Sequence, residues 1–129
     1  MAGLTLDAGA LIAVDRGDRR VISQLKRWLQ DGTRITVPAT AFAQAWRGAR
    51  NANLSRFSQL CAVEPFTELA ARRAGELCSA AGTSDIVDAS VVVSAGSRSD
   101  DILTSDVDDL SRLAPFVPRV GRILSISNV

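Results

Sequence analysis

Histidine is absent from this 129-residue sequence, and its absence excludes more classes of function than any other feature of the composition. Without histidine the chain lacks the usual general base, the usual serine and cysteine triads and the commonest zinc ligand. Tyrosine is absent too. Any acid–base or metal chemistry must therefore come from carboxylates, which favour a hard cation such as Mg²⁺ or Mn²⁺.

Cysteine and long apolar runs are also scarce. The two cysteines, Cys61 and Cys78, belong to no CxxC or metal-ligand pattern, and we expect buried thiols in a reducing compartment. The N-terminus lacks the basic segment and apolar run of a signal peptide, and no apolar stretch approaches the roughly eighteen residues of a membrane span. We therefore expect a cytoplasmic protein.

What is present favours one folded domain, residues 1–129, because 47% of the residues are hydrophobic and the net charge is only +1. The small net charge conceals an uneven distribution of basic and acidic residues along the chain. Residues 16–56 hold nine basic residues against two aspartates, whereas residues 85–109 hold seven aspartates against one arginine. Such a pairing suits a polyanion held over a metal site, although charge counts alone favour two solvated faces of opposite sign.

Apolar runs alternate with helical patterns along the chain. This alternation is typical of an α/β fold with a mostly parallel sheet covered on both faces. Ser84 is expected to cap the helix that precedes the predicted strand 101–104. The predicted strands are 4–6, 35–37, 101–104 and 122–126, with a short extended piece at 63–66, and the predicted helices follow residue 7 and span about 18–30, 39–47, 54–62, 67–81, 84–95 and 107–113.

Aspartates stand where predicted strands end. Open α/β sheets bind ligands outside the carboxyl ends of their strands. Asp7 ends the first strand, as either a turn former or a site residue, and Asp106 follows a later strand. Both lie on one rim if those strands are neighbours. Asp88 lies one helical turn beyond Asp85, so the two can face the same place.

Several of these acids have a purely structural explanation as well. Asp85 and Asp106 suit the first turn or the cap of a helix, and Asp108 and Asp109 are interpreted as partners of a helix dipole. Asp88 differs because the apolar helix Ala89–Val93 follows it. A carboxylate there needs a partner or a metal, which favours a functional role.

Three aspartate blocks together resemble a known family. Residues 6–13 (LDAGALIA), 85–92 (DIVDASVV) and 103–110 (LTSDVDDL) are similar to the aspartate blocks of PIN-domain nucleases. The chain looks most like the VapC-type toxins of bacterial toxin–antitoxin pairs, over nearly its whole length. The resemblance implies a three-layer α/β/α sandwich, Mg²⁺- or Mn²⁺-dependent endoribonuclease activity on RNA, a homodimer, and an antitoxin that blocks the site.

The mechanism implied is hydrolysis by metal-activated water. We hypothesise that Asp7, Asp88 and Asp106 are the catalytic metal ligands, with Asp85 and Gln44 in secondary roles. The metal lowers the pKa of a bound water and offsets charge on the attacked phosphate. This route leaves 5′-phosphate and 3′-hydroxyl ends, whereas a histidine-type route through the 2′-hydroxyl leaves a cyclic phosphate.

Two positions depart from the family pattern. Gln44 stands where the family usually has a glutamate, and Gly9 where it often has a serine. An amide oxygen can bind a metal or water but adds no negative charge. Two interpretations stay open: Asp85 restores the missing charge, or the chain is a weakened module that binds RNA or antitoxin without cutting.

Arginines beside the predicted site are candidates for holding RNA: Arg16, Arg19, Arg20, Arg47 and Arg50. Trp46 could stack on a base, but a core or dimer-interface role is preferred. Two other classes that cluster aspartates are disfavoured. A phospho-acceptor domain needs a basic residue late in the chain; Lys26 lies far too early, and Arg119 and Arg122 are poor substitutes. A sugar-phosphate phosphatase needs a second aspartate at position 9, where this chain has glycine.

Overall fold

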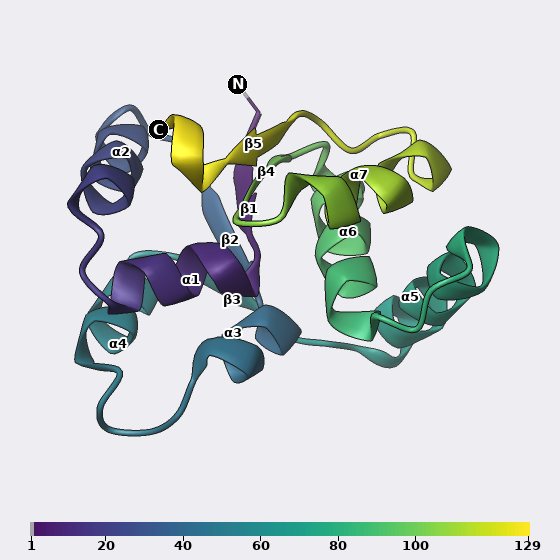
Figure 1. The fold of residues 1–129 in the computed structure, drawn as a ribbon, viewed down its shortest axis with the longest axis horizontal. Coiled ribbons are helices and arrows are strands. Elements are labelled where there is room, and N and C mark those ends of the chain that lie inside the picture. Colours follow the sequence, from purple (N-terminus) through teal and green to yellow (C-terminus); the bar gives the residue numbers. More distant parts are fainter. Residues whose placement is uncertain (1) are drawn as a thin grey trace.

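The computed structural model describes residues 2–129, and its centre is a parallel β-sheet (Figure 1). Within that range five strands lie in the order β3-β2-β1-β4-β5, and every neighbouring pair is parallel. The strands are β1 (Leu4–Leu6), β2 (Ile35–Pro38), β3 (Ala62–Glu64), β4 (Asp101–Thr104) and β5 (Ile123–Ser125). The predicted parallel sheet is confirmed.

Helices cover both faces of this sheet. They are α1 (Ala8–Asp15), α2 (Arg19–Gln30), α3 (Ala39–Ala45), α4 (Ala52–Ser58), α5 (Glu68–Ala81), α6 (Ile86–Arg98) and α7 (Val107–Leu113), with short 3₁₀ helices at Ala114–Phe116 and Ile126–Asn128. Figure 1 shows α1, α2 and α4 on one side of the sheet and α5, α6 and α7 on the other. The chain therefore forms the expected three layers.

The strand order reverses beside β1. The chain passes from β1 to β2 and β3 in one direction across the sheet, and then returns to place β4 on the other side of β1. Ligands of open α/β sheets bind at such a reversal, beyond the carboxyl ends of the strands. Asp7 directly follows β1, and Asp106 follows β4 after one intervening residue, Ser105.

The core lies on both sides of the central strands. Every residue of β1 and β2 is buried, as expected for parallel strands covered by helices on both faces. In α6, Val91 and Val92 are fully buried, so burial outweighs the strand preference of these β-branched residues. No single helix among residues 2–129 is long and apolar enough to span a membrane, and α5 and α6 pass that test only as a pair bent by 112°.

Several boundaries differ from those predicted. Asp85 rather than Ser84 caps α6, because its carboxylate accepts a hydrogen bond from the Asp88 amide at 3.1 Å. The helix predicted at 54–62 is α4, which begins and ends earlier. The extended piece predicted at 63–66 is β3, which begins at Ala62 and pairs with β2 at the edge of the sheet.

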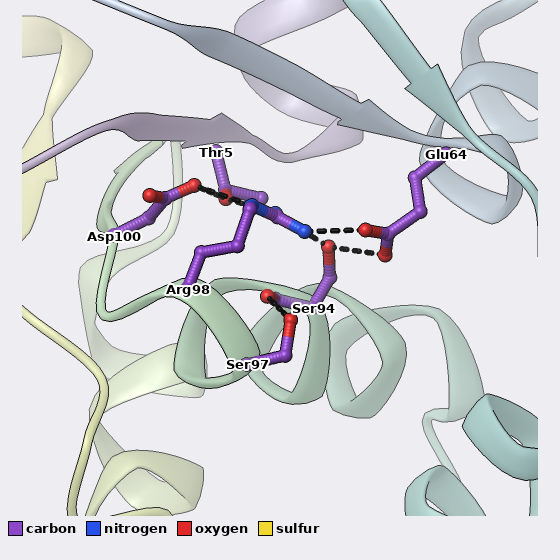
Figure 2. Close-up of polar contacts among 6 residues, drawn as sticks. All are labelled: Thr5, Glu64, Ser94, Ser97, Arg98 and Asp100. Atoms are coloured by element: carbon purple, nitrogen blue, oxygen red, sulfur yellow. Dashed lines mark hydrogen bonds and ion pairs between the residues drawn. The ribbon is translucent and has the colours of Figure 1, made fainter.

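Arg98 anchors the last turn of α6 to the sheet (Figure 2). Its guanidinium forms an ion pair with Glu64 at the end of β3, and its Nε donates to Asp100 at 3.0 Å. It also donates to the hydroxyls of Thr5, at 3.0 Å, and Ser94, at 2.8 Å. The network therefore ties α6 to β1 and β3.

The carboxylates of this network have further donors. Thr5 donates its hydroxyl proton to Asp100 at 2.8 Å, and Ser94 donates to Glu64 at 2.8 Å. Asp100 is only 3% exposed, so its charge depends on these partners. With its carboxyl-terminal end fixed, α6 presents its first turn, with Asp85 and Asp88, at the opposite end of the helix (Figure 1).

Candidate functional site

Asp7 is fixed at the carboxyl end of β1, where it caps α1. One carboxylate oxygen accepts from the Ala10 amide at 2.9 Å, and the other accepts a short hydrogen bond from the Thr104 hydroxyl. The side chain is almost fully buried, at 6% exposure. Burial raises the pKa of Asp7, and the hydrogen bonds from Thr104 and Ala10 offset part of that rise.

Asp106 lies beside Asp7, across the turn that follows β4. The Thr104 hydroxyl that donates to Asp7 also accepts from the Asp106 amide, at 2.8 Å, so one side chain links the two turns. Asp106 caps α7 by accepting from the Asp109 amide at 3.2 Å. The expected meeting of Asp7 and Asp106 on one rim is therefore observed, and the cap interpretation of Asp106 also holds.

Asp85 and Asp88 face this rim from the first turn of α6. Burial and then the charge of Asp85 raise the pKa of Asp88 to about 7, with smaller contributions from Asp7 and Asp109. These contributions place the α6 pair within electrostatic reach of the strand-end carboxylates. The functional interpretation of Asp88 gains support because no basic side chain among residues 2–129 forms an ion pair with it.

Asp109 is a member of the cluster that the sequence interpretation missed. A hydrogen bond with the Asp106 carboxyl raises the pKa of Asp109, and the charge of Asp106 raises it further. Asp109 also lines a cavity of about 210 Å³ with Asp85 and Asp88. The available signal was the spacing, because Asp109 follows Asp106 at the same three-residue interval that joins Asp88 to Asp85.

Comparisons with known proteins identify the family and the fold of this chain. A family model described as the PIN domain matches residues 4–114, which is most of the chain. The chain belongs to the PIN-domain family. A comparison with curated proteins gives no match.

Solved structures share the fold of this PIN domain. VapBC2 from Rickettsia felis bound to a promoter DNA fragment gives a TM-score of 0.71 at 12% identity, covering 95% of this chain and 97% of that one. DNA-bound VapBC from Salmonella typhimurium gives 0.69 at 18% identity, covering 98% and 99%. A toxin–antitoxin complex from Klebsiella pneumoniae gives 0.68 at 16% identity, covering 92% and 95%.

The donor set of this PIN domain fits a hard divalent cation. All the clustered donors are carboxylate oxygens, which hard cations prefer. Within residues 2–129, Arg112 is the one basic residue that forms an ion pair with a member of the cluster, Asp109, at 3.4 Å. As arranged, no three acidic or cysteine side chains of the described chain stand close enough together to enclose an ion. Binding would therefore require other side chains of the cluster to rotate toward Asp7, which two hydrogen bonds hold in place.

Gln44 is exposed on α3, which packs against α1 and α6. Figure 1 places α3 at the same end of the sheet as the first turns of those helices. No hydrogen bond joins its side chain to the aspartates within residues 2–129. Gln44 therefore lies in the neighbourhood of the site without contacting the carboxylates.

The arginines suggested for RNA binding are exposed: Arg16, Arg19, Arg20, Arg47 and Arg50. Trp46 stacks on Phe42 with 5.5 Å between ring centroids and packs partly buried against the core, which supports its structural interpretation. The largest cavity described, about 480 Å³, lies elsewhere, between α5, α6 and residues 116–119. It contains none of the clustered aspartates, so the chemistry points to the rim instead.

Proposed function

We propose that this PIN domain is a metal-dependent endoribonuclease that acts as the toxin of a type II toxin–antitoxin pair. The observation that carries the proposal is the convergence of Asp7, Asp85, Asp88, Asp106 and Asp109 at the switch point, with one arginine paired to the group. Five carboxylates held together with a single counter-charge favour a cation. The fold shared with VapBC and toxin–antitoxin structures supports the toxin role.

In this proposal Asp7, Asp88 and Asp106 hold Mg²⁺ or Mn²⁺, and Asp85 and Gln44 have secondary roles. The ion supplies a water of lowered pKa and offsets charge on the phosphate. Asp7 is already oriented by Thr104 and the Ala10 amide, so less freedom is lost when it binds. This orientation is what the chain contributes before any ion arrives.

The reaction proposed is hydrolysis of an RNA phosphodiester. The water oxygen forms a bond to phosphorus, the bond to the 3′-oxygen breaks, and that oxygen ends with a proton. The products carry 5′-phosphate and 3′-hydroxyl ends. The sequence contains no histidine that could drive attack by the 2′-hydroxyl, so carboxylate-based hydrolysis suits this chain better.

The proposed partners follow from the same role. The exposed arginines Arg16, Arg19, Arg20, Arg47 and Arg50 hold the RNA backbone by charge. A cognate antitoxin blocks the site, and the toxin is a homodimer in the cytoplasm. Co-expression with the antitoxin should therefore suppress any growth arrest that the toxin causes.

The direct test is the metal dependence and end chemistry of RNA cleavage. Purified protein is incubated with total RNA in Mn²⁺, in Mg²⁺ or in EDTA, and the fragment ends are mapped. We expect cleavage only with a divalent metal, with every new 5′ end carrying a phosphate. Metal-independent cleavage, or ends with a cyclic phosphate, would contradict the proposal.

Gln44 motivates a second candidate, a catalytically weakened PIN-domain module that binds RNA or antitoxin without cutting. Gln44→Glu adds the carboxylate at that position, and the matched control Gln24→Glu adds the same charge on α2, at a distance from the cluster. Cleavage by Gln44→Glu alone, with RNA binding by the wild type, would favour this candidate. Equal cleavage by the wild type and Gln44→Glu favours the active toxin.

A further inference from the structure

The side chain of Ser105 occupies the space that a side chain at position 9 would fill. A Cβ atom built on Gly9 would lie 1.8 Å from the Ser105 hydroxyl oxygen and 2.6 Å from the Ser105 Cβ. Gly9 belongs to the first turn of α1 and is not among the glycines with positive φ. The glycine is therefore required by the close approach of Ser105 and not by an unusual backbone.

Ser105 belongs to the turn that joins the two carboxylates at the switch point. Its neighbour on one side, Thr104, donates to Asp7 and accepts from the amide of Asp106, its neighbour on the other side. Ser105 itself is exposed, and none of the hydrogen bonds at this turn engages its hydroxyl. An exposed hydroxyl thus lies against the first turn of α1, in the space that a side chain at position 9 would fill.

Two other donors near this point are already occupied. The amides of Gly9 and Ala10 both stabilise the charged form of Asp7. Helix amides that serve a carboxylate do not serve an incoming phosphate. A phosphate that approaches Asp7 and Asp106 also meets their negative charge, so it gains from a hydrogen-bond donor placed beside them.

We propose that the Ser105 hydroxyl donates a hydrogen bond to a non-bridging phosphate oxygen of the bound RNA strand, beside Asp7 and Asp106. This inference rests on the proposed nuclease function and adds a substrate-binding residue to it. Gly9 makes the contact possible by leaving room for the Ser105 side chain.

The first test is the Ser105→Ala variant, followed through kcat, KM and Mn²⁺ affinity with a random-sequence single-stranded RNA pool. A hydrogen bond to a charged phosphate oxygen is stronger than one between neutral groups. We expect KM to rise about tenfold, with kcat and Mn²⁺ affinity little changed, because the contact holds substrate before and during reaction. An unchanged KM overturns the inference.

A hydroxyl exchange separates binding from packing. The double variant Gly9→Ser with Ser105→Gly moves the hydroxyl across the contact, and Gly9→Ala with Ser105→Gly fills the same space without it. We expect the first to restore KM to within about threefold of the wild type and the second to resemble Ser105→Ala. Equal KM values for the two double variants would show a packing role and overturn the inference.

Failure of the proposed function has a different signature. A wild type that cleaves RNA while Ser105→Ala does so with the same KM leaves the nuclease standing and removes Ser105 from the site. A folded wild type that neither binds nor cleaves the RNA pool in Mn²⁺ overturns both. Thermal unfolding identifies any variant that fails to fold. If one double variant fails, the KM of the other, compared with the KM values of the wild type and Ser105→Ala, decides the question.

Discussion

The two ends of α6 hold charge in opposite ways. At its carboxyl-terminal end, Arg98 lies between Glu64 and Asp100, and hydroxyl groups complete the network (Figure 2). At its amino-terminal end, Asp85 and Asp88 meet further carboxylates, and burial and mutual repulsion raise the pKa of Asp88 to about 7. One helix therefore joins a compensated cluster to an uncompensated one.

The compensated and uncompensated charge clusters at the two ends of α6 have different consequences for structure and function. A buried charge with all its partners in place specifies how elements pack, and its removal leaves the partners unsatisfied. A group of like charges without partners costs stability and persists where a ligand or a reaction uses it. We infer that the Arg98 network holds α6 in place so that Asp88 can be kept in an unfavourable setting.

The largest expected effect is on catalysis. Asp7→Asn keeps the shape of the side chain but removes a charge from the uncompensated cluster. We expect the rate of RNA cleavage to fall about a thousandfold, equivalent to about 4 kcal/mol. Asp31→Asn is the control, because Asp31 is exposed beside the amino ends of the strands, near Gly3 and Leu4. Equal rates for the two variants would contradict the assignment.

The next effect is on stability at the compensated end. Arg98→Met leaves the buried carboxylate of Asp100 without its cation, and should cost about 3 kcal/mol of unfolding free energy, or roughly 11 °C in Tm. Arg72→Met removes an exposed ion pair with Glu68 and should cost at most about 0.5 kcal/mol. Calorimetric or denaturant unfolding measures both. Similar losses would remove the distinction between a buried network and a surface pair.

Asp88 should make stability depend on pH in the metal-free protein. Because its pKa is raised from 3.8 to about 7, the folded state binds more protons than the unfolded state between these values, and stability falls as pH rises through them. Asp88→Asn should remove this component and be more stable at pH 8 by about 1–2 kcal/mol, since water screens the half-exposed group. Tm measured in EDTA from pH 4 to pH 8 tests this.

The pH series needs the same control as the cleavage assay. Asp31→Asn should follow the wild-type curve, because the general titration of the chain is common to all the proteins. A parallel pair of curves for the wild type and Asp88→Asn would contradict the raised pKa.

The smallest effect concerns a hydroxyl beside the Arg98 network. Thr36 pairs in register with Thr5, and its hydroxyl oxygen is the one buried side-chain polar atom of residues 2–129 without a hydrogen-bond partner. Thr36→Val should therefore stabilise the fold by about 0.5–1 kcal/mol. Thr5→Val should destabilise it, because the Thr5 hydroxyl bridges Arg98 and Asp100. Denaturant unfolding that shows the same sign for both variants would contradict this difference.

The sheet and the acids at its strand ends could be predicted from the sequence because their signals are local. Each central strand is a short apolar run, and Asp7, Pro38 and Asp106 mark where a strand ends. Parallel pairing brings Asp7 and Asp106 to one rim once β1 and β4 are neighbours, and that strand order came from the structure. Asp88 was favoured as a functional residue because an apolar helix follows it, and the family resemblance then grouped it with Asp7 and Asp106.

The compensated cluster could not be predicted in the same way. Thr5 and Glu64 lie 93 and 34 positions from Arg98, and no local pattern joins them. The contact of Gly9 with Ser105 likewise joins distant segments through packing. Asp109 was missed for a different reason, because an acid in the first turn of a helix already has a sufficient explanation.

The most direct test of the uncompensated cluster is Mn²⁺ binding by titration calorimetry at pH 7. We expect the wild type and Asp31→Asn to bind, Asp7→Asn and Asp88→Asn to lose binding, and Gln44→Glu to bind more tightly. The Arg98 network should make the same contribution to Tm in every one of these variants, because none of them changes a residue of the network. A well-folded wild type that binds no Mn²⁺ at millimolar concentration, or an Asp88→Asn variant that binds as tightly as the wild type, would contradict the metal site.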